Sequence, residues 1–330
     1  MVTVCKKYTN AYQPTRTISG PVKMQASYLS LDSDEFMDRI EQSYNLLDGC
    51  RICPHECGPD RLHDRKGFCR TGLLPQISSY GPHFGEEPPL VGSRGSGTIF
   101  FANCNLACEF CQNYEISQCG GGWEVPCETV ASAMIELQER GCHNINLVSP
   151  SHVVPQVISS ISIAAAKGFQ IPIVYNSGGY ESVEALKLLD GIIDIYMPDA
   201  KYGSDEIALT LSRAPEYVRH MQDALTEMHR QVGDLKIVGG IAVRGMIIRH
   251  LVLPENLAGS DIVLPWIAER ISKDAYVNIM SQYHPAWHVT APREGLPPSL
   301  SRRITLQEYV FAVECAKKAG LYRGFPTRFG

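Results

Sequence analysis

Three cysteines within eight residues constrain this chain more than any other feature of its sequence. Cys104, Cys108 and Cys111 form a CxxxCxxC pattern directly after the apolar run TIFFA, residues 98–102. With 12 cysteines in 330 residues, chance would produce this spacing about 0.016 times. The pattern therefore indicates a metal site in a loop that follows a strand.

The number of thiols favours an iron–sulfur cluster over zinc at this loop. A structural zinc ion needs four ligands, and the next cysteine or histidine after Cys111 is Cys119. Each iron of a cubane cluster binds one thiolate or a substitute ligand. Three thiolates from one loop therefore leave one iron open.

The composition limits the class of protein. The chain is 44% hydrophobic and 20% charged, as an ordinary globular protein is. A formal charge of -5 disfavours a broadly basic nucleic-acid surface. The sequence has no apolar run long enough to cross a bilayer, and its start, MVTVCKKYTN, lacks the apolar segment of a signal peptide. We expect a cytoplasmic protein with no nucleic-acid or membrane partner.

From residue 98 onward, short apolar runs alternate with helical stretches, which is typical of repeated βα units and a parallel sheet. The six predicted strands, too few for a closed eight-stranded barrel, are 98–102, 144–148, 172–175, 192–197, 245–253 and 275–282. The predicted helices are 34–47, 129–140, 154–167, 182–189, 216–230, 260–272 and 305–319. The last one ends at Gly320, a residue that favours helix C-termini.

A second cysteine set lies upstream, in a stretch that reads as loop. Residues 50–89 are rich in Gly, Pro, Cys and His, and GSRGSG at 92–97 marks a flexible boundary. We therefore expect an N-terminal extension over 1–95 and a regular α/β core with a C-terminal helix over 96–330. The extension contains Cys50, Cys53, Cys57 and Cys69, enough thiols for zinc or a second iron–sulfur cluster. A reduced, metal-free set of thiols is the alternative.

The string FFANCNLACEFCQNYEISQ resembles the radical S-adenosylmethionine (SAM) enzymes, whose signature places an aromatic residue before the last cysteine. Phe110 supplies that aromatic residue. The sequence is most similar to the pyruvate formate-lyase activating enzyme-like subgroup, which is related to the glycyl-radical activases. The resemblance continues through YNSGGYES, YMPDAKY and AVRGMIIRHLVLP, and covers most of residues 50–330.

The resemblance implies an α/β fold, a partial (β/α)₆ barrel with a cysteine-rich N-terminal extension. It also implies a [4Fe-4S] cluster on Cys104, Cys108 and Cys111, with S-adenosylmethionine bound to the open iron. An electron from a flavodoxin- or ferredoxin-type donor would cleave this cofactor and give a 5′-deoxyadenosyl radical, which abstracts hydrogen. The cofactor carries the chemistry, while the protein positions it and excludes water and oxygen.

Polar residues at the ends of the predicted strands are the candidates for binding the cofactor. Many relatives have a Gly-Gly-Glu stretch after the second strand, where this chain has Ser149-Pro-Ser-His152. Asp199 and Lys201 match a DxK stretch that lies beside the cofactor in glycyl-radical activases. Only one of the neighbouring Arg249 and His250 can face the barrel interior. The full set of predicted cofactor-binding residues is Phe110, Asn176, Gly178, Gly179, Asp199, Lys201 and Arg249.

The function expected from these features is that of an oxidoreductase which works under anaerobic conditions and abstracts hydrogen from a protein or peptide. One such reaction is the activation of a glycyl radical enzyme. His284, after the sixth strand, is a candidate catalytic residue facing the substrate. Two alternatives stay open at this point. One is radical modification of a small molecule or peptide, and the other is a zinc-binding interaction protein whose two cysteine sets are structural.

Overall fold

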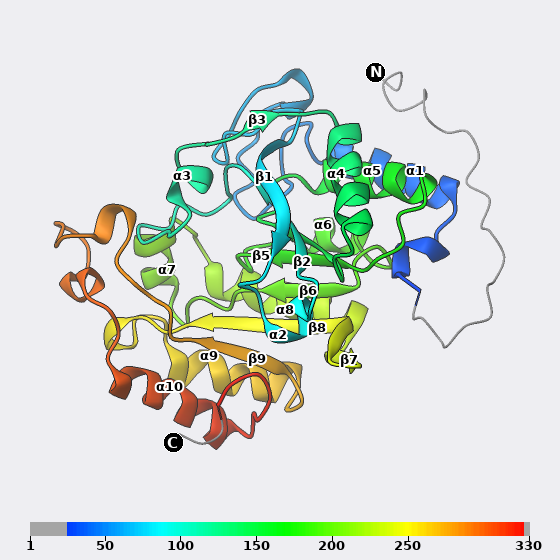
Figure 1. Ribbon diagram of the computed structural model, residues 1–330. Helices are drawn as coiled ribbons and strands as arrows, with labels where there is room; N and C mark the ends of the chain where they lie inside the picture. Colours follow the sequence, from blue (N-terminus) through cyan, green and yellow to red (C-terminus); the bar gives the residue numbers. More distant parts are fainter. Residues whose placement is uncertain (1–24, 327–330) are drawn as a thin grey trace.

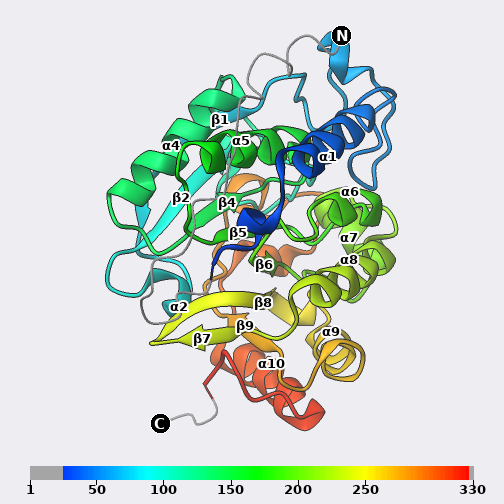
Figure 2. The ribbon, with the colours of Figure 1, turned by 90° about the vertical axis from the view of Figure 1, so that its right-hand side faces the viewer.

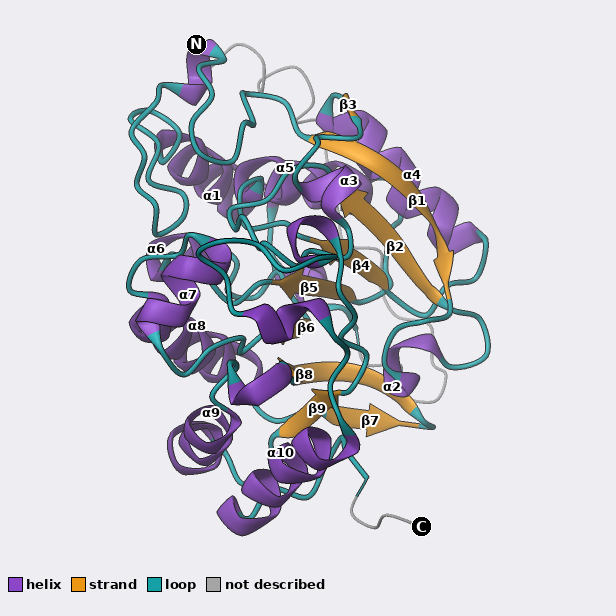
Figure 3. Ribbon diagram, turned by 90° about the vertical axis from the view of Figure 1, so that its left-hand side faces the viewer, coloured by secondary structure: helices purple, strands orange, loops and turns teal. Residues whose placement is uncertain are grey.

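The structure, a computed structural model, describes residues 25–326 of the chain; the first 24 residues of the expected N-terminal extension lie outside the described residues. A central sheet lies inside a layer of helices (Figure 1). In Figure 3 the strands follow an open arc, from β1 at the upper right through β4 and β5 to β9 at the bottom. The predicted α/β fold with a mostly parallel sheet is confirmed.

Six parallel strands form the body of the sheet, as the sequence predicts. Neighbours pair in parallel from the first to the last of them. In the described part of the chain the first and last of the six do not pair with each other, so the arc stays open between them. The six strands are β2 (Ser96–Phe101), β4 (Ile145–Val148), β5 (Ile173–Ser177), β6 (Ile195–Pro198), β8 (Ile241–Leu251) and β9 (Tyr276–Met280).

Three antiparallel strands extend the sheet beyond the prediction: β1 (Gln76–His83), β3 (Trp123–Glu124) and β7 (Lys236–Val238). Strand β1 pairs with β2 along most of its length, so the expectation that 50–89 is all loop was wrong for this segment. Gly81 and Pro82 interrupt the alternation by which a strand is recognised, which is why the sequence did not reveal it.

Helices cover the outer side of the arc, where α1 packs against α5 and α6 (Figure 2). The longer helices are α1 (Ser33–Asn45), α4 (Cys127–Glu139), α5 (Val154–Ala166), α6 (Val183–Leu188), α7 (Asp205–Ser212), α8 (Tyr217–Val232), α9 (Ser260–Trp266) and α10 (Leu306–Ala319). The helix predicted over 260–272 contains Pro265 and continues after α9 as a π-helical turn, because proline removes a backbone donor. Helix α7 and two single-turn helices, α2 (Pro88–Val91) and α3 (Tyr114–Ser117), were not predicted.

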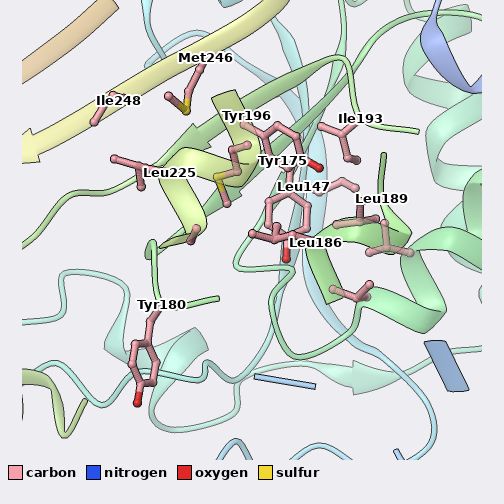
Figure 4. Packing of buried hydrophobic residues seen from close by; sticks show 14 of the residues in the cluster. Leu147, Tyr175, Tyr180, Leu186, Leu189, Ile193, Tyr196, Leu225, Met246 and Ile248 are labelled. Carbon is pink, nitrogen blue, oxygen red and sulfur yellow. The ribbon is translucent and has the colours of Figure 1, made fainter. Parts of the chain in front are cut away.

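Apolar side chains pack on both faces of the sheet. On the outer face, Tyr175 belongs to one large cluster with Leu186 of α6 (Figure 4). On the inner face, Val174 and Ile247 form a separate cluster with Leu90 of α2. The residues two positions further along these two strands are polar and share the inner face. The interior of the arc therefore changes from apolar to polar toward the carboxyl ends of its strands.

Candidate functional site

A cavity of about 450 Å³ lies at the carboxyl ends of the parallel strands. All three cysteines of the CxxxCxxC loop line it. Residues at the ends of successive strands form much of the rest of the cavity lining: Ser149 after β4, Asn176 and Gly178 at the end of β5, Asp199 and Lys201 after β6, and Arg249 in β8. In barrels of parallel strands, this end is where active sites are built.

Each thiol of the loop has a local polar contact. The Ser212 hydroxyl donates to Cys108 Sγ at 3.0 Å, and the backbone N–H of Leu106 lies 3.4 Å from Cys104 Sγ. Cys111 Sγ lies 3.1 Å from the Ser117 hydroxyl. Burial raises the pKa of Cys104 to about 12 and that of Cys108 to about 11. At neutral pH these thiols keep their protons unless a metal displaces them.

A buried network of charges crosses the cavity wall from β6 to β8. Asp199 accepts from Lys201 Nζ and from Arg249 Nε, the latter at 2.7 Å. Arg249 Nη2 also donates to Asn176 Oδ1 at 2.6 Å. Burial alone would raise the pKa of Asp199, but the Arg249 and Lys201 cations outweigh it and lower that pKa. Two cations and one anion therefore face this side of the cavity.

Of the adjacent pair in β8, Arg249 faces the cavity and His250 does not. His250 is buried on the other side, with Nδ1 2.7 Å from the backbone oxygen of Ala200 and Nε2 2.8 Å from the Ser260 hydroxyl. Burial lowers the pKa of His250 to about 4, so the ring is neutral at physiological pH. The prediction that only one of the two residues points inward is confirmed.

At Gly178 and Gly179, which follow β5, neighbouring atoms pack too closely for any residue with a side chain. Gly179 has φ +74°, and an added Cβ would lie 2.1 Å from the backbone oxygen of Asp199. At Gly178, an added Cβ would lie 2.6 Å from Leu106 Cδ1 in the cysteine loop. These two positions therefore bring the β5 end against both the charged network and the cysteine loop.

Three of the residues predicted to contact the cofactor or substrate, Phe110, Gly179 and His284, lie outside the cavity lining. Phe110 is buried edge-on against Tyr283, with ring centroids 5.8 Å apart, and Gly179 packs against the backbone of Asp199. His284 Nδ1 lies 3.1 Å from Gln112 Nε2, beside the cysteine loop. Their proposed roles toward the cofactor or substrate stay predictions.

The segment Ser149-Pro-Ser-His152 after β4 divides between the cavity and the core. Ser149 lines the cavity, whereas the Ser151 hydroxyl donates to Glu181 and His152 Nε2 lies 3.0 Å from the backbone oxygen of Ala102. Glu181 also accepts from the Tyr175 hydroxyl at 3.1 Å. Burial raises the pKa of Glu181 to about 7. The sequence reasoning did not single out Glu181.

Two further carboxylates in the cavity were also missed. Glu86 and Glu87 line it from the segment between β1 and α2, and Glu87 Oε1 accepts from Asn278 Nδ2 of β9 at 2.8 Å. In the sequence, two adjacent acidic residues before Pro88 and Pro89 look like part of an ordinary exposed turn. Only the pairing of β1 with β2 reveals that they turn inward.

The four upstream cysteines lie in a segment, residues 50–70, that contacts the CxxxCxxC loop. Cys50, Cys53 and Cys69 are buried and Cys57 is exposed. Burial raises the pKa of the Cys53 thiol, and the three other thiols raise it further, so the four lie within electrostatic range of one another, although in residues 25–326 they do not converge on a single ion.

Two contacts join this four-cysteine segment to the loop. His55 Nε2 donates to the backbone oxygen of Asn105 at 2.8 Å. Arg70 Nη2 donates to the backbone oxygen of Ser117 at 2.7 Å, and the Ser117 hydroxyl contacts Cys111. The segment therefore contacts the loop near its first and last cysteines.

Comparisons with known proteins agree with this arrangement. Residues 98–250 match the family model described as the radical SAM superfamily. The chain is 32% identical over 292 residues to the "Uncharacterized protein MJ0674" of Methanocaldococcus jannaschii, an alignment that covers 86% of this chain and 78% of that protein.

Two solved structures are more distantly similar. HydG, described as a maturase of the [FeFe]-hydrogenase, gives a TM-score of 0.44 at 12% identity, with 90% of this chain and 63% of HydG covered. Methylornithine synthase (PylB) gives a TM-score of 0.44 at 16% identity, with 89% of this chain and 72% of PylB covered. In residues 25–326, no helix has the length and apolar character needed to span a membrane.

Proposed function

Because the chain belongs to the radical SAM superfamily, we propose that Cys104, Cys108 and Cys111 hold a [4Fe-4S] cluster and that the enzyme abstracts hydrogen from a protein or peptide substrate. The observation that carries this proposal is the cavity lined by all three thiols together with a buried set of cations and carboxylates. When bound, the cluster and S-adenosylmethionine supply the reductive cleavage that starts hydrogen abstraction.

The thiol donors fit a cluster of several irons. Among residues 25–326, no three His, Cys, Asp or Glu side chains are close enough together to hold a single metal ion. A cubane does not need this convergence, because each iron binds only one thiolate. Three thiolates leave the fourth iron for an exogenous ligand, which in this superfamily is S-adenosylmethionine.

The charged network supports binding of the cofactor's methionine group. Lys201 and Arg249 supply positive charge for a carboxylate, and the buried setting strengthens the attraction because water is largely excluded. Asp199 supplies an acceptor for an ammonium or ribose hydroxyl, and it holds both cations in place. Asn176 orients Arg249 through its side-chain oxygen.

The open side of the arc supports a macromolecular substrate. Strands β2 and β9 are not paired in the described residues, and this open side of the arc of parallel strands would be the approach for a polypeptide loop. Among peptide positions, the glycine Cα is the candidate suggested by the similarity to glycyl-radical activases. The electron would come from a flavodoxin- or ferredoxin-type protein, because this chemistry consumes one electron per cleavage.

We also propose that the four-cysteine segment holds a second metal centre, for which an iron–sulfur cluster is favoured over zinc, because no three of its side chains converge on a single ion in the described residues. The nearness of its four thiols supports this assignment. Its hydrogen bonds to Asn105 and Ser117 would then let a bound metal order the cysteine loop. Metal binding stabilises loop-rich segments because the folded ligand set rarely exists without it.

The test is anaerobic reconstitution with iron and sulfide, followed by S-adenosylmethionine and a reductant. Cys108→Ala should lose formation of 5′-deoxyadenosine and methionine, whereas the exposed Cys119→Ala should keep it. Adding cell extract to the wild-type reaction should then give a protein radical signal or a mass shift in the acceptor. Cleavage retained by Cys108→Ala would refute the cluster assignment.

A further inference from the structure

The carboxylates Glu86 and Glu87 approach the cavity from a different direction than the thiols. Strand β1 runs antiparallel to β2 and ends at His83, which pairs with Ser96 at the start of β2. The cysteine loop follows the opposite end of β2. A strand of this length spans roughly 17 Å. The carboxylates therefore enter from the end of the arc that lies away from the cysteine loop.

Glu87 has one carboxylate oxygen without a partner. Only 6% of the residue is exposed, and Oε1 accepts from Asn278 Nδ2. Oε2 is buried and has no hydrogen-bond partner among the described residues. A buried carboxylate oxygen without a donor is costly, so a native site of this kind normally receives a donor from a bound group.

The cations already in the cavity do not supply that donor. The Arg249 guanidinium is near enough to attract both carboxylates, but its Nε and Nη2 donate to Asp199 and Asn176. Lys201 donates to Asp199. His83 Nδ1 lies 3.2 Å from Glu86 Oε1, so His83 pairs with Glu86 and does not supply the donor for Glu87.

The charged groups on the cavity wall also favour a cationic ligand. The cavity wall contains two cations, Lys201 and Arg249, and three carboxylates, on Asp199, Glu86 and Glu87. By number of side chains the carboxylates exceed these two cations by one, and His83 beside Glu86 Oε1 is the third basic group. A cationic ligand group would complement this wall, and an N–H of that group would give Glu87 Oε2 its missing donor.

We propose that Glu86 and Glu87 bind a positively charged group of the substrate, an ammonium or guanidinium, at the end of the cavity away from the thiols. This inference rests on the proposed function, and it adds the chemical class of the substrate. In a peptide substrate the group is a lysine or arginine side chain near the residue that loses hydrogen. The same chemistry would accept a free alkylamine, and the experiment separates the two sources.

The experiment measures binding by titration calorimetry to anaerobically reconstituted protein with S-adenosylmethionine present. The probes are butylammonium, butylguanidinium and neutral butanamide, together with two blocked tripeptides, Gly-Lys-Gly and Gly-norleucine-Gly. The cationic member of each set should bind about 10- to 100-fold more tightly than its neutral counterpart, as expected for a charged hydrogen bond. Tighter binding of the lysine peptide than of butylammonium would identify a peptide as the source of the cation, and the reverse order a free amine.

Three variants test the residues. Glu87→Gln should abolish the preference for the cation, and Glu86→Gln, at a half-buried position that tolerates change, should reduce it. Glu206→Gln, exposed at the start of α7, should leave it unchanged. If Glu87→Gln fails to fold, the result with Glu86→Gln decides the question.

Two results would overturn the inference. One is equal binding of cationic and neutral probes by wild-type protein that still cleaves S-adenosylmethionine, which would leave the proposed function intact. The other is a loss of affinity for S-adenosylmethionine in Glu87→Gln as large as the loss for the cations, which would assign the carboxylate to the cofactor's ammonium. Absence of cleavage by the wild type would instead refute the proposed function and leave the binding preference to be judged separately.

Discussion

Replacing Glu181 by Gln should make the protein more stable than the wild type above pH 7, although the residue is buried and hydrogen-bonded. Burial raises the pKa of this carboxyl from its ordinary value of 4.5 to about 7. Between these two pH values the folded chain binds a proton that the unfolded chain has lost. The free energy of unfolding therefore falls as the pH rises through this window, and it stays lower above pH 7.

The size of the effect follows from the shift in pKa. A rise from 4.5 to about 7 corresponds to about 3 kcal/mol of lost stability at pH 8. For a chain of 330 residues this is about 4 °C in melting temperature. Gln has no proton to lose, and its amide can still bond to the Ser151 and Tyr175 hydroxyls, because hydroxyls both donate and accept. At pH 5 the variant and the wild type should therefore melt at similar temperatures.

The assay is thermal unfolding of both proteins at pH 5, 6, 7 and 8 under anaerobic conditions. The difference in melting temperature isolates Glu181, because Asp194, whose pKa burial raises to about 6, contributes equally to both proteins. Glu184→Gln is the matched control, since that exposed carboxylate pairs only with the exposed Arg51, at 3.6 Å. A difference between Glu181→Gln and wild type that is the same at pH 5 and pH 8 would refute the reasoning.

Three further substitutions test the site and its support. Cys53→Ala should lower the bound metal or the melting temperature and spare cleavage of S-adenosylmethionine; an unchanged iron and zinc content would count against the second metal site. Gly179→Ala should lower the melting temperature further than Gly168→Ala, because both have positive φ but only the first adds a Cβ that clashes; equal losses would contradict this. Asp199→Asn should cost about 3–5 kcal/mol of stability, because it leaves two buried cations without their carboxylate. The control Asp223→Asn, at an exposed carboxylate, should cost under about 1 kcal/mol. Similar losses of stability in the two variants would argue against a buried network.

The parallel part of the fold could be predicted from the sequence because its strands are continuous apolar runs. Buried strands such as 195–198 are apolar on both faces, and the helices between them have clear amphipathic spacing. Strand β1 could not be predicted, because its pairing with β2 is a tertiary contact between a polar segment and a buried one. The π-helical turn after α9 likewise depends on how Pro265 packs.

The residues of the candidate site likewise divide into those that the sequence alone identifies and those that it does not. Cys104, Cys108 and Cys111 are close in sequence, so their spacing alone identifies them. Asp199 and Arg249 are 50 residues apart, and no local pattern indicates that one bonds to the other. Glu86 and Glu87 were missed because nothing in their local sequence shows that the chain turns back into the arc there. What sequence reasoning loses are the contacts that topology creates between residues far apart in the chain, and residues such as Glu86 and Glu87 that only those contacts bring into the site.

The two ends of the cavity together restrict which atom of a substrate can react. In the proposed function, hydrogen abstraction would occur near the thiol end, because Cys104, Cys108 and Cys111 would hold the cluster and its cofactor there. If a substrate cation is bound by Glu87 at the other end, the reacting C–H bond must be separated from that cation by a chain that spans the cavity. A lysine or arginine side chain has such a chain, and its flexible carbons can lie along the wall formed by Phe100 and Met280. The reacting carbon would then belong to the backbone or to the first atoms of the side chain, and not to the carbon next to the charged group.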